Sequence, residues 1–313
     1  MSAEILPLRG HTGPLQVQDW RQKLEHWCAR LEECVHKPSR RHVHSLRAAT
    51  LRLQAELDAC LQSGTVSLAV ARAAQRWSRK AKRVRKLLGP VRDTDVCLEL
   101  LETFCGPGAD AAKAESPDAR DYLHAIERLK CAIRRRRETA GKRMILVLEA
   151  QHSRIVAAAR ELGQALATSG AASFDNRVAL QTLVKELAAA ASNLTPAALH
   201  GFRKLAKTGR YLAEHVPLPD ARTQELALQC KAIQTAIGQW RDWTALSEYA
   251  QEKASHRAGR ILVAQLSETA TRLLGEALVQ CQQAATALAD PAHAKPVRRP
   301  VQSIHGSSAR RLA

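Results

Sequence analysis

The chain of 313 residues is rich in Leu and Ala, has only 4% aromatic residues, and contains 15 Gly and 12 Pro, a composition that favours an all-helical protein over a β-rich one. Its formal net charge is +18, with 28 Lys and Arg against 18 Asp and Glu in residues 1–150 and 20 against 12 in the remainder. Both halves carry an excess of positive charge, so the charge does not come from a basic tail. It predicts a polyanionic partner such as nucleic acid, polyphosphate or an anionic membrane.

The sequence does not fit a membrane-spanning, secreted or metal-binding protein. No apolar run approaches the roughly 18 residues that cross a bilayer, and the first residues, MSAEILPLRG, lack the basic-then-apolar order of a signal peptide. The eight cysteines form no CxxC motif and no Cys/His ligand spacing. We therefore expect a reduced, cytoplasmic protein without a metal or cofactor.

The first half of the chain predicts four helices after a loose lead-in at residues 1–14. Apolar residues recur at helical spacing, Ser39 is a suitable cap for the second helix, and Ser63-Gly64 is a stop signal for it. The Gly89-Pro90 step is expected to break or bend the third helix. The expected helices cover residues 17–36, 39–61, 66–104 and 118–167, with a loop over residues 106–117.

The second half predicts another four helices, and Ser169-Gly170 marks the boundary. The expected helices cover residues 174–191, 196–215, 222–249 and 252–289. The chain therefore predicts a first four-helix unit over residues 15–168 and a second over residues 172–290. The tail at residues 291–313, with its Pro and Arg residues, is expected to be disordered.

One helix of the second unit, ALHGFRKLAKTGRYLAE at residues 198–214, is strongly amphipathic. Thr195 is a suitable N-cap and Pro196 a suitable first helical residue. Residues three and four apart share a face, so an apolar stripe backs a polar stripe formed by His200, Arg203, Lys204, Lys207 and Arg210. A basic stripe on a surface helix is usually only solvated, so a second observation is needed before it indicates a site.

An internal repeat supplies that second observation. His44-Ser-Leu-Arg47 parallels His200-Gly-Phe-Arg203, and Gly89-Pro-Val-Arg92-Asp93 parallels Gly238-Gln-Trp-Arg241-Asp242. Two matches in the same order, on equivalent helices, favour a duplication. Two four-helix units packed against each other would bring two basic stripes to a shared groove.

At these residues the chain resembles the CHAD family, the conserved histidine α-helical domain. Matching segments cover most of residues 15–290. Leu51 and Gln54 stand where the family usually has arginines, so the first basic stripe is thinner than the second. The matching segments are Val43-His44-Ser45-Leu46-Arg47-Ala48-Ala49-Thr50-Leu51-Arg52, Leu88-Gly89-Pro90-Val91-Arg92-Asp93-Thr94-Asp95-Val96, His200 with Arg203, Lys204, Lys207, Arg210 and Tyr211, and Ile233-Gln234 with Ile237, Gly238 and Asp242.

The resemblance implies an all-α fold of two four-helix bundles, related by an internal pseudo-two-fold repeat, with a basic groove or channel between them. It also implies binding of inorganic polyphosphate without catalysis. In the family this domain often follows a triphosphate-cleaving domain with an ExExK signature. No ExExK occurs in this sequence, so we expect a binding module and not an enzyme.

Polyphosphate is a flexible chain of dense negative charge that calls for many Arg and Lys in a row. The first candidates to bind it are Arg47, Arg52, Arg203, Lys204, Lys207 and Arg210, and His44 and His200 are further candidates. A second group on the third helix contains Arg76, Arg79, Arg83 and Lys86. The residues expected to support these groups are Arg92, Asp93, Tyr211, Arg241 and Asp242.

The two histidines and the acidic residues allow more than one interpretation. As metal ligands, His44 and His200 lack Cys or carboxylate partners at ligand spacing. They could donate hydrogen bonds to phosphate, gaining charge below about pH 6.5, or have a purely structural role, and the sequence leaves both open. Asp93, Asp95 and Asp242 are expected to pair with arginines or to cap a broken helix, and not to bind a metal.

Three function classes follow from these patterns. A polyphosphate-binding module, located in the cytoplasm with polyphosphate or other storage granules as a candidate site, fits best. A nonspecific nucleic-acid-binding protein is second, because the charge favours it but stacking aromatics and a known binding motif are missing. A helical scaffold is third. An enzyme is least expected, because no nucleophile–base set, P-loop or metal cluster is present.

Overall fold

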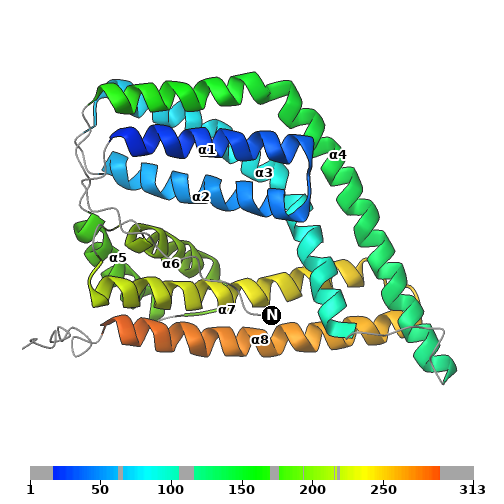
Figure 1. Cartoon of the computed structure of the whole chain (residues 1–313). Helices are drawn as coiled ribbons and strands as arrows, with labels where there is room; N and C mark the ends of the chain where they lie inside the picture. The colour runs from blue at the N-terminus through cyan, green and yellow to red at the C-terminus, as the bar shows by residue number, and fades with distance from the viewer. Residues whose placement is uncertain are drawn as a thin grey trace, which may run out of the picture.

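The computed structural model describes residues 17–62, 66–105, 116–169, 176–192, 194–214, 216 and 219–289. Within these ranges every regular element is an α-helix and none is a strand, so the predicted all-α fold class is confirmed. The helices, in chain order (Figure 1), are α1 (Val17–His36), α2 (Arg40–Gln62), α3 (Leu68–Cys105), α4 (Pro117–Thr168), α5 (Asn176–Ala191), α6 (Leu199–Glu214), α7 (Ala221–Gln251) and α8 (Arg257–Ala289).

The helices match the predicted ones with small shifts at their ends. Residues 196–198 form a turn before α6, and residues 252–256 lie outside helix before α8. Of the two outcomes predicted at Gly89-Pro90, a break or a bend, the structure has the bend: α3 continues through Pro90 as one bent ribbon (Figure 1). Because proline has no N–H to donate within the helix, one backbone bond is lost there without ending the helix. The lead-in at residues 1–14, the loop at 106–115 and the tail at 291–313 lie outside the described residues.

Ser39 caps α2 directly, as predicted, whereas α6 begins at Leu199 and Thr195 caps the turn at residues 196–198 that precedes it. The Ser39 hydroxyl accepts a hydrogen bond from the His42 N–H at 3.3 Å, and the Thr195 hydroxyl accepts one from the Ala198 N–H at 3.3 Å. Each cap satisfies a donor that the first turn would leave without a partner. His44 is the fifth residue of α2 and His200 the second residue of α6, so both lie near the N-terminal ends of these helices.

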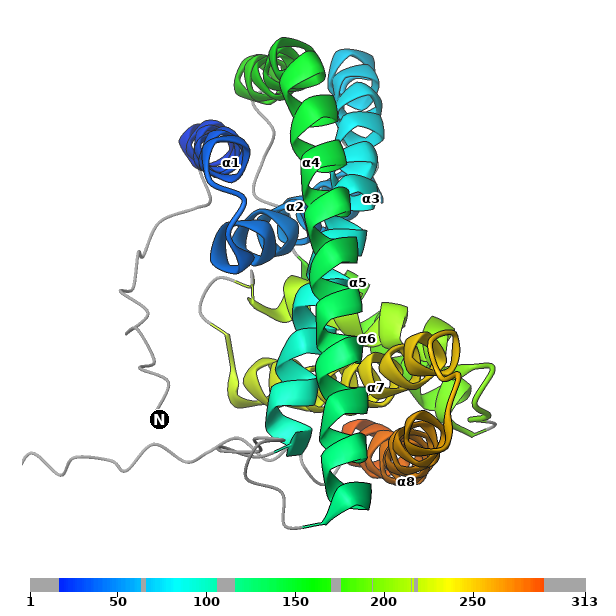
Figure 2. The same ribbon diagram turned by 90° about the vertical axis from the view of Figure 1, so that its right-hand side faces the viewer.

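Apolar side chains form three buried clusters. One lies among α1, α2, the first half of α3 and the second half of α4, and another among α5, α6, the first half of α7 and the second half of α8. The third is built from the remaining halves of α3, α4, α7 and α8, so it draws on both predicted units. Figure 2 shows α4 running the length of the molecule, past α1 and α2 and on to α8. The boundaries of two separate units stay a prediction.

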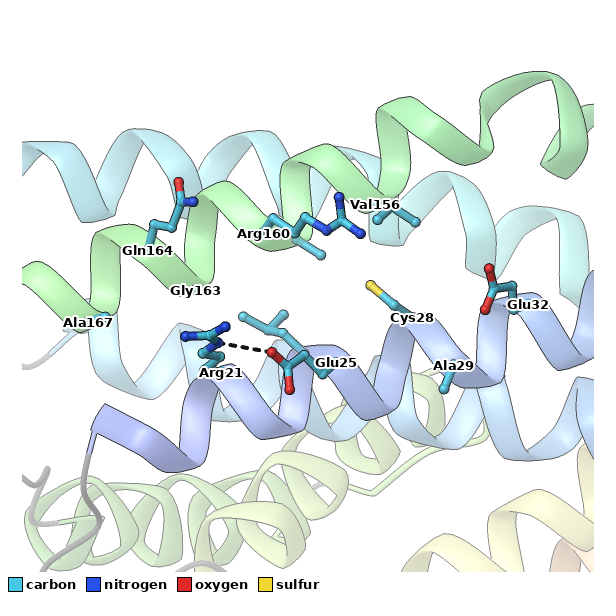
Figure 3. Close-up of a pocket in the computed structure, with 12 residues that line it drawn as sticks. Arg21, Glu25, Cys28, Ala29, Glu32, Val156, Arg160, Gly163, Gln164 and Ala167 are labelled. Atoms are coloured by element: carbon cyan, nitrogen blue, oxygen red, sulfur yellow. Dashed lines mark hydrogen bonds and ion pairs between the residues drawn. The ribbon is translucent and has the colours of Figure 1, made fainter.

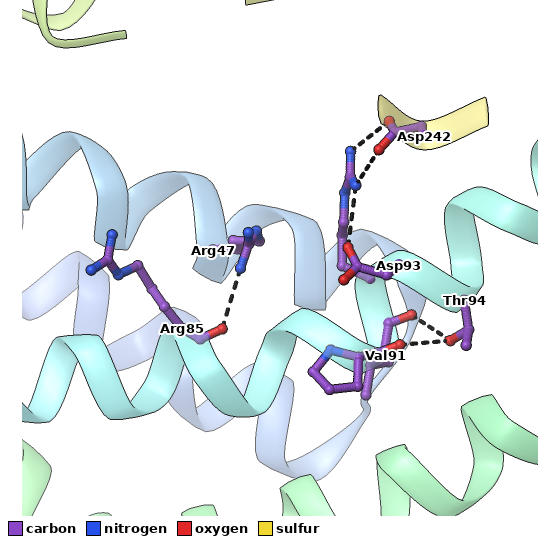
Figure 4. A network of polar contacts seen from close by, with 8 residues as sticks. Arg47, Arg85, Val91, Asp93, Thr94 and Asp242 are labelled. Carbon is purple, nitrogen blue, oxygen red and sulfur yellow. Dashed lines mark hydrogen bonds and ion pairs between the residues drawn. The ribbon is translucent and has the colours of Figure 1, made fainter. Parts of the chain in front are cut away.

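A polar contact joins the two halves where α3 meets α7. The Arg92 guanidinium donates two hydrogen bonds to the Asp242 carboxylate, at 2.9 and 3.0 Å (Figure 4). Both side chains are 25% exposed, so water screens the pair only in part. Arg92 also lies 3.3 Å from Asp93, whose side chain is 61% exposed. The pair connects the two recurring Arg-Asp sequences, since Arg92 and Asp242 belong to different copies.

Close packing seats α6 against α5 and α7. A Cβ atom added to Gly209 would clash with the Leu183 side chain and lie 3.0 Å from the Cys230 sulfur. Gly209 lies on the side of α6 opposite Lys207, because the two positions are 200° apart on an ideal helix, at about 100° per residue. The glycine thus lets the apolar face of α6 approach its neighbours, which holds the basic face toward α2.

We predict that Asp242→Asn lowers the free energy of unfolding by about 1–3 kcal/mol, because it leaves the half-buried Arg92 without its carboxylate. Asp93→Asn is the matched control, since this exposed carboxylate should contribute less than about 0.5 kcal/mol. Urea denaturation followed by circular dichroism measures both. Equal losses in the two variants would contradict a structural role for the Arg92–Asp242 pair.

We predict that Gly209→Ala destabilises the protein by about 1–3 kcal/mol through overpacking, although alanine favours helix. Gly201→Ala on the same helix is the control, because no atom lies within 4 Å of the added Cβ. That change should leave stability equal or raise it by up to about 1 kcal/mol. Thermal unfolding of the two variants gives the comparison, and a Gly209→Ala protein as stable as Gly201→Ala would contradict the packing argument.

Candidate polyanion-binding site

Cationic side chains from four helices meet where α2 faces α6 and α3 faces α7, and we call this set the cationic junction. On α2, Arg47 donates a hydrogen bond to the backbone carbonyl of Arg85 on α3 at 3.2 Å (Figure 4). On α6, the Arg203 guanidinium lies close to α7, since a Cβ on Gly238 would be 3.6 Å from its Nη2 atom. The junction consists of Arg47, Arg85, Arg92, Arg203, Lys207 and Arg241.

Lys207 shows how strongly these charges act on one another. Burial and the positive charges of Arg203, Arg47 and Arg85 lower the pKa of the Lys207 amine to about 7, from an ordinary value of 10.5. Burial also lowers the pKa of Arg47 and Arg203. Lys207 is therefore only partly protonated at neutral pH, and an anion placed beside it would favour the charged form.

Two buried donors at the junction have no hydrogen-bond partner among the described residues. They are the Nε atoms of Arg85 and Arg203. A buried donor left without a partner costs about 1–3 kcal/mol. The carboxylates that act on Arg47 and Arg203 are Asp93 and Asp242, and Asp242 is already bound by Arg92. The junction thus holds more positive charge and more donors than its own acidic residues can satisfy.

The predicted candidates divide between the junction and its edge. Arg47, Arg203 and Lys207 are half-buried within it, whereas Lys204 is exposed. Glu214 lies 2.7 Å from Arg210 and 3.8 Å from Arg52, so this carboxylate joins the edge of α6 to α2. The Tyr211 ring is buried, with the Lys207 amine 5.9 Å from its centre.

The two predicted histidines are exposed near the N-terminal ends of α2 and α6. Desolvation lowers the pKa of His44, and the charges of Arg92, Arg40, Arg47 and Arg52 lower it further. The pKa of His200 is lowered by desolvation and by Lys204, Arg241 and Arg203. Both imidazoles are therefore neutral at neutral pH, where each offers one N–H donor and one acceptor.

The aspartates pair with arginines, as predicted. Asp242 binds Arg92, and Asp95 accepts a hydrogen bond from Arg137 at 2.7 Å. Arg241 is exposed beside Asp242. Among the described residues no group of three or more His, Cys, Asp and Glu side chains could hold a metal ion.

The second predicted group, on α3, is not brought into the junction. Arg76 pairs with Glu161 of α4, with its Nε 2.9 Å from the carboxylate, and Arg83 approaches the amide of Gln151, also on α4. Arg79 and Lys86 are exposed on the outward face of α3. The α3 residue that does enter the junction, Arg85, was missed by the sequence analysis. Arg85 lies seven residues before Arg92, which is two helical turns, so the two share a face of α3, and this spacing could have identified Arg85 as a candidate.

A separate hollow of about 550 Å³ lies between α1 and α4 (Figure 3). Its polar rim includes Arg21, which pairs with Glu25 at 2.9 Å, and Arg160. Burial raises the pKa of the Cys28 thiol in this hollow to about 11, so it stays protonated at neutral pH. Because the thiolate is the nucleophile and the metal ligand, this hollow carries no reactive sulfur.

No helix in the described part of the chain has both the length and the apolar character needed to cross a membrane.

Comparison with known proteins places this arrangement in a family. The structure is similar to PptA from Streptomyces chartreusis, with a TM-score of 0.62 and 18% identity over 88% of this chain and 100% of that chain. It is also similar to the CHAD domain from the plant Ricinus communis, with a TM-score of 0.51 and 19% identity over 92% of this chain and 96% of that one. No curated protein matches the sequence.

At these identities the two structures show a shared fold and leave the ligand open. The family model of the CHAD domain matches residues 18–251, which is well over half of the chain and includes the whole cationic junction. The resemblance seen in the motifs is thereby confirmed: the chain belongs to the CHAD-domain family.

Proposed function

We propose that this protein binds inorganic polyphosphate at the cationic junction, without catalysis, in the cytoplasm and at polyphosphate or other storage granules. The observation that carries the proposal is the surplus of half-buried positive charge at the junction. Arg85 and Arg203 keep buried Nε donors without a partner among the described residues, and burial lowers the pKa of Lys207 to about 7. An anion with many oxygen acceptors would satisfy both the charges and the donors.

The chemistry of the junction favours a flexible polyanion over nucleic acid. Single strands are commonly held by bases stacked on exposed aromatic rings, and the aromatic ring beside Lys207, Tyr211, is buried. A stiff duplex presents its phosphates on a convex surface and would reach exposed cations more readily than half-buried ones. A narrow phosphate chain can enter between side chains that a duplex cannot.

The proposal includes no reaction, because the junction offers charge and donors only. The guanidinium groups, and the Lys207 amine in the charged form that a bound anion favours, stabilise phosphate oxygens by charge and by hydrogen bonds. The neutral imidazoles of His44 and His200 lie near the N-terminal ends of α2 and α6, where they add hydrogen bonds to a bound phosphate. The residues proposed to bind are those of the junction together with His44, Arg52, His200, Lys204 and Arg210.

We predict that Arg47→Gln, Arg203→Gln and Lys207→Gln, combined in one variant, lower the affinity for long-chain polyphosphate by at least about a hundredfold. The estimate follows from three charge-assisted contacts of about 1.5–3 kcal/mol each, discounted because such losses are not additive. The control removes equal charge elsewhere through Arg135→Gln, Arg143→Gln and Arg154→Gln, all exposed on α4. Isothermal titration calorimetry at physiological salt measures each variant.

The same titration is repeated with duplex and single-stranded DNA as competitors. Polyphosphate should displace DNA at equal charge concentration, and the junction variant should lose this advantage. If DNA displaces polyphosphate, or if the α4 control loses as much affinity as the junction variant, the binding is a nonspecific effect of net charge and the proposed function is wrong.

We predict that polyphosphate affinity falls as the pH rises from 7 to 8.5, by up to about tenfold per pH unit. Free Lys207 loses its proton through this range because its pKa is about 7, and a bound polyanion raises that pKa, so binding takes up a proton. Affinity is therefore highest below pH 7. In the free protein His44 and His200 are already neutral throughout this window, because their pKa values are lowered below the ordinary 6.5.

Calorimetry in buffers of different ionisation enthalpy measures the proton uptake directly. Lys207→Arg is the control, since a guanidinium stays charged throughout and should remove the pH dependence while keeping the affinity. Unfolding does not explain the effect, because the contribution of Lys207 to stability rises over the same range, where the unfolded chain binds more protons than the folded one. A wild-type affinity independent of pH would contradict the protonation of Lys207 on binding.

A further inference from the structure

The outward face of α3 carries a row of six exposed cations that the junction does not use. Arg76 pairs with Glu161, while the other five form no ion pair among the described residues. No acidic residue occurs on α3 before Asp93. The row consists of Arg72, Arg76, Arg79, Lys82, Arg83 and Lys86, and we call it the α3 row.

The α3 row continues directly from the junction. Lys82 lies one helical turn before Arg85, and Lys86 directly follows Arg85. Arg79 lies one turn before Lys82 and Arg72 about three turns before it, both on the same outward face. At 1.5 Å per residue, the distance from Arg72 to Lys86 along the helix is about 21 Å. Figure 4 shows Arg85 beside Arg47, so the end of the row meets the half-buried charges.

The fold itself does not require this row. Aligning Gly89-Pro-Val-Arg92-Asp93 with Gly238-Gln-Trp-Arg241-Asp242 assigns to each cation of the row the α7 residue at the matching position of the repeat. Only one of them, Lys231, is basic, and one is acidic. The matching positions, in order, are Ala221, Glu225, Leu228, Lys231, Ala232 and Thr235. Since α7 forms an equally continuous helix without the charges, helix formation does not account for the row on α3.

Like charges at this spacing also have a cost. Cations three and four residues apart repel each other by about 0.2–0.5 kcal/mol per pair on an isolated helix. Lys82–Lys86, Arg79–Lys82, Arg79–Arg83, Arg72–Arg76 and Arg76–Arg79 are such pairs. A bound polyanion would remove this repulsion.

We propose that the α3 row is an extension of the junction that holds the part of a long polyphosphate chain leaving it, so that the two surfaces together select for chain length. The proposal rests on the proposed function, because the junction must hold one segment of the same chain. A short chain occupies the junction alone. A long chain adds exposed, solvated contacts along α3 and releases more counterions when it binds.

The arrangement of the row favours this occupant over a duplex or a membrane. The cations follow one helix in a single direction and end at half-buried charges, which suits a narrow chain entering the junction. Membrane-binding helices combine a basic face with bulky apolar residues that enter the lipid. Between Arg72 and Lys86 the remaining outward position is Gln75, and the exposed apolar side chain of Leu68 lies one turn before the row and not within it.

The test compares tripolyphosphate with long-chain polyphosphate on the full chain. The variant combines Arg72→Gln, Arg79→Gln, Lys82→Gln and Lys86→Gln, because glutamine removes charge but keeps helix propensity. Arg76 and Arg83 are left in place because they contact α4. The control removes four exposed cations remote from the row, through Arg134→Gln, Arg135→Gln, Arg257→Gln and Arg260→Gln. Circular dichroism and thermal unfolding check the fold of each.

For long chains, the α3 variant should lose at least about tenfold in affinity. The negative slope of log affinity against log salt concentration should become shallower by about 3. Its tripolyphosphate affinity should stay within about twofold of wild type. The control should leave both affinities within about threefold. The double variant Arg79→Gln/Lys86→Gln should show about half of the change in slope.

Several results would overturn the proposal. An equal loss for short and long chains would show a general field effect and no extended path. An unchanged long-chain affinity, with the junction variant still defective, would remove the row from the site and leave the proposed function standing. A loss confined to DNA or to vesicles of anionic phospholipid would assign the row to another partner. If wild-type protein binds neither polyphosphate, the proposed function fails as well.

Discussion

The Arg92–Asp242 ion pair is the contact on which the arrangement of the junction depends. It lies where α3 meets α7, and it uses up the carboxylate that would otherwise neutralise Arg203. The third apolar cluster adds a nonpolar connection between the same long helices. Together these contacts hold α2 and α6 against each other, with positive charges that the protein does not itself neutralise. A loss of the pair would therefore affect both stability and the charge balance at the junction.

The unbalanced charge has an energetic cost that the apolar cores must offset. Burial favours the neutral amine of Lys207 and leaves donors of Arg85 and Arg203 without partners among the described residues. Each of the two buried clusters beside the junction contains enough apolar side chains to offset this cost, since a fully buried Leu or Phe contributes on the order of 1.5–3 kcal/mol. A site that is destabilised without its ligand is stabilised by binding, which couples occupancy to the folded state.

The proposed binding mode gives two kinds of positive charge different purposes. All the junction residues except the exposed Arg241 are half-buried, so their interactions with an anion are strong and only weakly screened. The α3 row is exposed, so its contacts are individually weak and depend on salt. In combination they would give a polyphosphate-binding protein that holds one segment firmly and gains affinity with chain length. The asymmetry between α3 and α7 means that the two halves contribute unequally, although their motifs recur.

Local sequence patterns were enough to predict the helices and the family. Helical spacing of apolar residues, the caps Ser39 and Thr195, and the recurring His-x-x-Arg and Gly-x-x-Arg-Asp segments each act over a few residues. Only the tertiary structure decided which cations meet. It placed Arg85 in the junction, turned Arg76 and Arg83 toward α4, and paired Arg92 with Asp242 across 150 residues. Those outcomes depend on how distant helices pack, and the depressed pKa of Lys207 arises from charges on other helices as well as its own, which no single segment could reveal.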